Sequence, residues 1–137
     1  MRAFIDTSSL FKKYVEENGS GELDALLQKV SEIAVSPVTR LEMASVVARR
    51  LREKSLTPQQ AVWLKTEMRR DFHSFHCVLW NDALEERAAE LIDRYSLLTL
   101  DAIQLASGML SKADVFATSD RRLFEQARKA LDKVLYL

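Results

Sequence analysis

The sequence has little of several residue types, and each scarcity excludes a class of protein. Its one cysteine, Cys77, allows neither an intrachain disulfide nor a zinc site built from cysteines. Three glycines are too few for the glycine-rich loop of a dinucleotide-binding enzyme. No apolar run approaches the roughly 20 residues that a membrane span needs, and no signal-peptide pattern opens the chain. We therefore expect a cytoplasmic protein with no membrane association.

Excess positive charge is absent from most of the chain and is concentrated in one stretch. The 20 basic and 20 acidic residues balance overall, but residues 38–70 carry eight basic and three acidic side chains, a net charge of +5. A basic face beside acidic ones suits a polyanionic partner, whose binding would depend on salt. The alternative is that these residues form the solvated faces of two ordinary helices.

Short apolar runs alternate with helical patterns along the whole chain. The runs predict strands near residues 3–5, 33–35, 78–79, 115–117 and 134–135. Between them, apolar residues recur every three or four positions, as they do in amphipathic helices. This alternation favours an α/β fold with a parallel sheet of four or five strands, formed by a single domain over residues 1–137. Right-handed crossovers would then bring the carboxyl ends of the strands to one edge.

Polar residues at the expected helix starts predict how several helices begin and which side chains they bury. Three pairs have capping-box spacing: Thr39 with Glu42, Thr57 with Gln60, and Asp82 with Glu85. Thr99 is expected to cap the helix that contains Asp101. The side chains expected to face the core from the two helices of the basic stretch include Leu41, Ala44, Val47, Ala48, Leu51, Trp63, Leu64 and Met68.

Four acidic residues are expected near the carboxyl edge of the sheet. Asp6 and Asp120 directly follow expected strands, whereas Glu42 and Asp101 fall in the first turns of helices. Carboxylates that lie close together repel one another, and a divalent cation would keep them ionised. Oxygen donors without histidine or cysteine favour Mg²⁺ or Mn²⁺. Taken singly, each acid could instead cap a helix or favour its dipole, and Thr7 or Ser8 could cap the helix expected at residues 9–15.

The same residues resemble the four sequence motifs of one protein family. Residues 4–10 match the first motif, residues 36–42 the second, residues 100–106 the third and residues 116–120 the fourth. On these motifs the sequence resembles a PIN-domain ribonuclease, and most of all the VapC toxins of bacterial and archaeal toxin–antitoxin pairs. The resemblance runs from end to end and implies a PIN-like three-layer α/β/α fold.

The resemblance also implies a chemistry and a set of partners. It implies Mg²⁺- or Mn²⁺-dependent endonucleolytic cleavage of single-stranded RNA, with Asp6, Glu42, Asp101 and Asp120 as the metal-binding and catalytic residues. Thr7 and Thr118 would orient a ligand or a water molecule, or would serve only as turn residues. A cognate antitoxin and a second copy of the chain are the implied protein partners. The side chains that would hold RNA phosphates are Arg49, Arg50, Arg52, Lys65, Arg69 and Arg70.

Two other functions remain open from the sequence. A non-catalytic PIN-like RNA-binding or scaffold protein would keep the fold and the basic face without a bound metal. A phosphatase would use Asp6 as a covalent nucleophile, although Ser8 stands where such enzymes usually carry a second aspartate.

Overall fold

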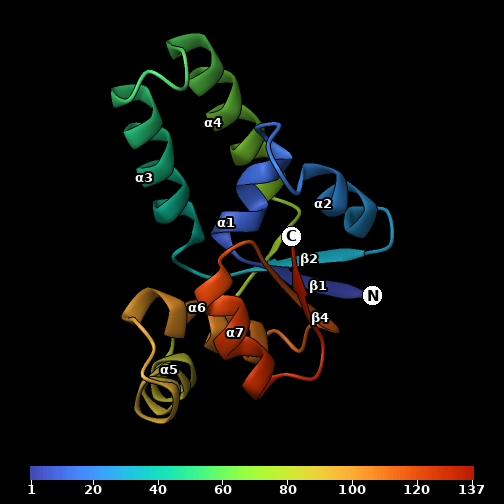
Figure 1. Ribbon diagram of the computed structural model, residues 1–137, viewed down its shortest axis with the longest axis vertical. Coiled ribbons are helices and arrows are strands. Elements are labelled where there is room, and N and C mark those ends of the chain that lie inside the picture. Colours follow the sequence, from blue (N-terminus) through green and yellow to red (C-terminus); the bar gives the residue numbers. More distant parts are fainter.

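A parallel sheet of five strands forms the middle layer of the computed structural model, which describes residues 1–137 (Figure 1). The strands lie in the order β3-β2-β1-β4-β5, with β1 at the centre. Every neighbouring pair is parallel, so the carboxyl ends of all five strands meet at one edge. The strands are β1 (Arg2–Ile5), β2 (Glu32–Val35), β3 (His76–Cys77), β4 (Val115–Thr118) and β5 (Val134–Tyr136).

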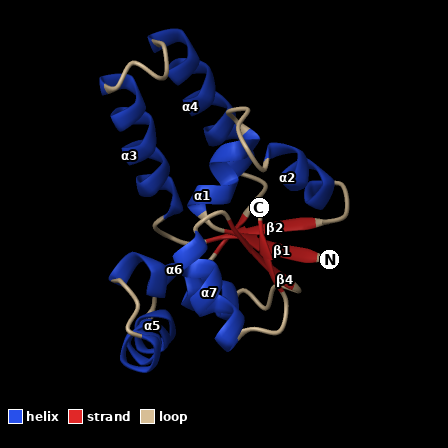
Figure 2. Cartoon of the chain, viewed as in Figure 1, coloured by secondary structure: helices blue, strands red, loops and turns tan.

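Helices cover both faces of the sheet, which gives the expected three-layer α/β/α arrangement (Figure 2). Successive residues of β1 point to opposite faces, so Phe4 and Ile5 belong to different hydrophobic cores. None of the helices is both long and apolar enough to cross a lipid bilayer. One layer contains α1 (Thr7–Leu10), the 3₁₀ turn η1 (Phe11–Lys13), α2 (Ser20–Leu27), α3 (Thr39–Arg52) and α4 (Pro58–Phe72). The other layer contains α5 (Asp82–Tyr95), α6 (Thr99–Leu110) and α7 (Arg121–Ala130).

The third strand lies two residues earlier than the apolar run near residues 78–79 predicts. It covers only His76–Cys77, and Leu79 beyond it is 75% exposed. The neighbouring strand β2 ends at Val35, whose carbonyl accepts the last ladder hydrogen bond, from the Val78 N–H. Pro37 follows and has no N–H to donate, so β3 has no further partner.

The buried face of α3 also differs from the expected one. Leu41 is 74% exposed, and Ala44 and Ala48 are exposed as well; Met43 is buried instead, while Val47 is buried as expected. On α4, Trp63 is 54% exposed while its neighbour Leu64 is buried. Both helices carry apolar residues on more than one face. Because α3 and α4 extend away from the sheet together, only one face of each helix packs against the core (Figure 1).

One of the expected capping boxes is confirmed, and the others are wrong by one residue. In the confirmed box, Thr57 Oγ1 accepts from the Gln60 N–H at 3.1 Å while Gln60 Oε1 accepts from the Thr57 N–H at 2.8 Å. Asn81, not Asp82, caps α5. The N-cap positions of α3 and α6 are Val38 and Leu98, so neither Thr39 nor Thr99 caps its helix. In each wrong case the helix has already begun at the polar residue, one position after its actual N-cap.

A glycine on α6 permits this helix to approach the sheet closely. The rings of Phe4 and Phe116, on neighbouring strands, stack with their centroids 5.1 Å apart. A Cβ atom added to Gly108 would lie 2.5 Å from Phe116 Cδ2 and 3.4 Å from Phe4 Cδ1. The fully buried rings have no free space into which they could move.

We predict that Gly108→Ala lowers the free energy of unfolding by about 1–3 kcal/mol because the added methyl overpacks the core. This is the net loss, after the gain of about 1 kcal/mol in helix propensity has been subtracted. Gly21→Ala is the matched control, since nothing lies within 4 Å of its Cβ position, and it is expected to stabilise by about 0.4–1 kcal/mol. Urea denaturation followed by circular dichroism measures both, and equal stabilisation by the two substitutions would refute the close packing.

Candidate functional site

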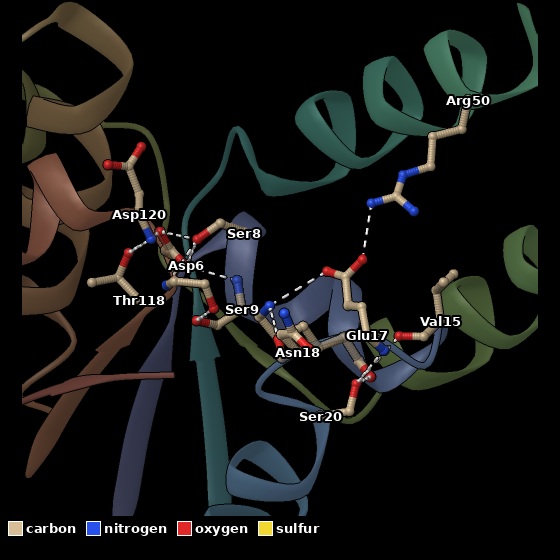
Figure 3. A network of polar contacts seen from close by, with 12 residues as sticks. Asp6, Ser8, Ser9, Val15, Glu17, Asn18, Ser20, Arg50, Thr118 and Asp120 are labelled. Atoms are coloured by element: carbon tan, nitrogen blue, oxygen red, sulfur yellow. Dashed lines mark hydrogen bonds and ion pairs between the residues drawn. The ribbon is translucent and has the colours of Figure 1, made fainter. Parts of the chain in front are cut away.

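The first acidic residue lies at the end of the central strand and is almost fully buried. Asp6 follows β1, is 3% exposed and forms the N-cap of α1, a role for which Thr7 and Ser8 were also candidates. Its Oδ1 accepts from the Ser9 N–H at 3.0 Å. Ser8 Oγ donates to the same carboxylate, and Thr118 Oγ1 donates to Oδ2 at 2.6 Å (Figure 3). The carboxylate is therefore held from both the β1–α1 turn and the end of β4.

Burial raises the pKa of Asp6 to about 6 from its ordinary value of 3.8. The hydrogen bonds from Thr118, Ser9 and Ser8 favour the ionised form, but they only partly offset the loss of solvation. The negative charge of Asp120 raises the pKa further. Asp6 is thus a carboxylate that would be stabilised by a nearby cation, and no basic side chain supplies one.

The second strand-end acid is tied to the first through a shared threonine. Asp120 follows β4 and caps α7, with its Oδ1 accepting from the Leu123 N–H at 3.0 Å. The Asp120 N–H donates to Thr118 Oγ1, the hydroxyl that itself donates to Asp6 (Figure 3). A hydrogen bond of 2.8 Å between the Ser9 and Ser119 hydroxyls joins the two turns as well. Parallel pairing of β1 with β4 makes this arrangement possible.

Asp101, in the first turn of α6, lies near the other acids. Its pKa is raised above the ordinary value, first by partial burial and then by the charges of Asp120 and Glu42. Arg122, from the first turn of α7, acts in the opposite direction. Asp120 therefore interacts electrostatically with both Asp6 and Asp101, and Glu42 with Asp101. The structure brings the four acids together at the carboxyl edge of the sheet.

Glu42, on α3, is held by residues of two other helices. Thr7 Oγ1 donates to Glu42 Oε1 at 3.0 Å, and Gln104 Nε2 donates to the same oxygen at 2.5 Å. Gln104 Nε2 also donates to Thr7 Oγ1 at 3.0 Å. The three side chains form a closed set of hydrogen bonds between α1, α3 and α6. Glu42 thus makes these contacts instead of completing a capping box with Thr39.

The donor set of this edge fits a hard divalent cation. Four carboxylates from four segments lie at this edge, and Asp6 and Asp101 have raised pKa values. As the side chains stand, no three histidine, cysteine, aspartate or glutamate residues are grouped closely enough to hold an ion. Binding would therefore draw the carboxylates inward. Oxygen ligands of this kind suit Mg²⁺ or Mn²⁺, which would also relieve the repulsion between Asp120 and its neighbours.

An open groove of about 650 Å³ lies beside the acidic edge. Thr7, Ser8, Glu42 and Ser119 line it on one side, and the basic residues along it are Lys12, Arg49 and Arg50. The Arg50 guanidinium is already engaged, because Nη2 lies 3.0 Å from Glu17 Oε2 and the group stacks 4.5 Å from the Phe11 ring centre (Figure 3). Arg49 is exposed and makes only a 4.0 Å contact with Glu53.

The remaining basic candidates do not border this groove. Lys65 and Arg69 line a separate groove of about 240 Å³ between α3 and α4. Arg70 pairs with Glu67 and lies 3.8 Å from Asp71, and Arg52 is exposed at the end of α3. Four of the six residues therefore line two separate grooves, of which only the one with Arg49 and Arg50 adjoins the acids.

Sequence reasoning missed three side chains that act on the acids: Ser8 on Asp6, Arg122 on Asp101 and Gln104 on Glu42. Gln104 had a signal in the sequence. It is a polar residue inside the apolar run 102–106, one helical turn after Asp101. A polar residue on the buried face of a helix needs a partner, and here the partner is at the site.

The raised pKa of Asp6 predicts a pH dependence of stability that Asp6→Asn removes. The folded protein binds this proton more tightly than the unfolded chain, so the stabilisation is complete below pH 3.8 and is lost as the pH rises through about 6. Between pH 4 and 7.5, the free energy of unfolding of the wild type should fall by about 2.5 kcal/mol relative to Asp6→Asn. Urea denaturation in EDTA at each pH measures the free energy of unfolding. If it changes with pH equally in the two proteins, the raised pKa of Asp6 is contradicted.

Comparisons with known proteins agree with the fold. A family model described as "PIN domain" matches residues 3–130. A comparison with curated proteins gave no significant match. Among solved structures, a "Toxin-antitoxin complex from Klebsiella pneumoniae" aligns with a TM-score of 0.69 at 20% identity, over 97% of this chain and 95% of that one.

Two further structures are similar to the chain over nearly its whole length. FitAcB from Neisseria gonorrhoeae has a TM-score of 0.70 at 14% identity, over 98% of this chain and 96% of that one. VapBC2 from Rickettsia felis, bound to a DNA fragment from its promoter, has a TM-score of 0.67 at 12% identity, over 100% and 99%. The TM-scores and the coverage establish a shared fold with all three structures. Because the family model covers nearly all of the sequence, the chain belongs to the PIN domain family.

Proposed function

We propose that this protein is a Mg²⁺- or Mn²⁺-dependent endoribonuclease that cleaves single-stranded RNA, and that it is the toxin of a toxin–antitoxin pair. The observation that supports this most is that four carboxylates lie near one another at one sheet edge. Two of them follow β1 and β4, and two lie in the first turns of α3 and α6. A structural explanation accounts for each acid singly as a cap or a first-turn residue. It does not account for the burial of Asp6 without a cationic partner.

The proposed mechanism assigns a task to each side chain of the edge. Asp6 would be the central ligand, held in place by Thr118, Ser8 and the Ser9 N–H. Glu42, Asp101 and Asp120 would bind the cation directly or through water. A bound Mg²⁺ or Mn²⁺ supplies Lewis-acid activation of a water for in-line attack and stabilises the charge that develops on the phosphate. Thr7 and Thr118 would keep the carboxylate oxygens in fixed orientations through their hydroxyls.

The groove beside the acids is the proposed path of the RNA strand. Arg49 is the best placed of the basic residues, because it is exposed there and has only a weak ionic partner. Arg50 would have to exchange Glu17 for a phosphate before it could contribute. Contacts of this kind position a backbone and do not read its bases, so they are compatible with a single-stranded substrate of any sequence.

A protein partner is proposed from the structural neighbours. The Klebsiella structure is a toxin–antitoxin complex, and an antitoxin of this chain would inhibit it by covering the acidic edge. An arginine offered by that partner could pair with the carboxylates in bidentate geometry. We also propose that the protein acts in the cytoplasm and forms a homodimer, for which exposed Leu79, Trp80, Leu98 and Leu100 provide apolar contact surface. Light scattering of the purified chain measures the dimer directly.

The wild-type protein should cut a labelled single-stranded RNA internally when Mn²⁺ is present, and EDTA should stop the reaction. Asp6→Asn should lower the rate by about two orders of magnitude or more, because the central ligand loses its charge. Asp93→Asn is the matched control: it makes the same chemical change at an exposed position on α5, and its rate should equal that of the wild type. Gel electrophoresis of the fragments measures all three proteins.

Equal cleavage by the wild type and Asp6→Asn would remove the nuclease proposal and leave a non-catalytic PIN-domain binding protein. A loss of activity in Asp93→Asn of the same size as in Asp6→Asn would show that net charge, and not the acidic edge, determines the rate.

A further inference from the structure

Gln104 is a buried glutamine beside the acidic edge, and the four motifs give it no function in the site. Gln104 is 3% exposed and lies on α6 between the apolar residues Ile103 and Leu105. Its side chain reaches Thr7 on α1 and Glu42 on α3, so one amide links three helices that meet at the site. Of these three residues, only Glu42 belongs to the proposed ligand set.

The direction of each hydrogen bond in this set follows from the chemistry of the groups. The Thr7 hydroxyl has one proton, which it donates to Glu42 Oε1. The Thr7 oxygen must then accept from Gln104, which requires the amide nitrogen and not the amide oxygen to face it. The same nitrogen also donates to Glu42 Oε1. Two donors therefore converge on one oxygen of Glu42.

The other end of the amide has no partner. Gln104 Oε1 is buried and receives no hydrogen bond. An apolar residue of similar length would avoid this unsatisfied oxygen, so packing alone does not explain a glutamine at this position. The hydrogen bonds of the Gln104 nitrogen explain it, because one of them is donated to the Glu42 carboxylate at the site.

We propose that Gln104 is a positioning residue, which with Thr7 holds Glu42 by Oε1 and leaves Oε2 directed to the groove for a cation or its bound water. Glu42 lines that groove, and no hydrogen bond within the protein engages Oε2. The inference rests on the proposed function, since it concerns the same site. It adds a residue that never touches the substrate and acts only through the orientation of Glu42.

The test measures Mn²⁺ affinity and stability separately in Gln104→Met, which keeps the length and removes the amide. Thermal unfolding at increasing Mn²⁺ concentration gives the dissociation constant. We expect affinity to fall about 10–100-fold, while the unfolding midpoint in EDTA stays equal to that of the wild type or rises. Thr7→Val should weaken Mn²⁺ binding in the same way, and Thr7→Ser, which restores the hydroxyl, should return it towards the wild-type value.

Ser107→Ala is the matched control, because it removes another buried and unpartnered polar group from α6, one turn further along. It should bind Mn²⁺ as the wild type does. Wild-type affinity in both Gln104→Met and Thr7→Val would overturn the positioning role while leaving the nuclease proposal intact. A wild-type protein that Mn²⁺ does not stabilise at all would overturn the proposed function, and this inference with it.

Discussion

The site depends on one buried carboxylate held at the end of the central strand. Asp6 loses the solvation of its charge on folding, and hydrogen bonds from two turns recover only part of it. The same hydrogen bonds fix the position of the carboxylate, since Thr118 contacts both Asp6 and the Asp120 N–H. A buried carboxylate with a raised pKa is stabilised by a proton or by a nearby cation, and the charge of Asp120 adds to this preference.

Much of this arrangement is predictable from the sequence, because it depends on chain topology. A β1 strand buried on both faces appears as an apolar run, and the acid after it must lie at the carboxyl edge. The same reasoning locates Asp120 after β4. Right-handed crossovers bring the carboxyl ends of the strands to one edge. To predict these features, one needs to know only where each strand or helix ends, to within a residue or two. The order of the five strands and the proximity of Asp101 and Glu42, in contrast, come from the structure.

What the sequence could not predict depends on which of several equivalent side chains makes a contact. Thr39 and Glu42 have capping-box spacing, but Glu42 bonds to Thr7 and Gln104, both distant along the chain. Leu41 and Met43 are both apolar, and only the approach of α3 to the sheet decides that Met43 is the buried one. Arg50 is one of several basic residues, and its pairing with Glu17 depends on the path of the turn between η1 and α2. In each case tertiary packing, and not the local sequence, determines which side chain makes the contact.

The hydrogen bond between Thr118 and Asp6 has a consequence for protein synthesis. Thr118 and Asp6 are 112 positions apart, and β4 pairs with β1 only after β2, β3 and the four long helices α3 to α6 have been made. A nascent polypeptide that has not yet emerged from the ribosome beyond β4 lacks both the hydroxyl that positions Asp6 and the acid of the following turn. Asp6 is translated 112 residues before Thr118, so the complete edge forms only after β4 and the turn that follows it have been made. Truncated or stalled translation products therefore carry an unassembled centre.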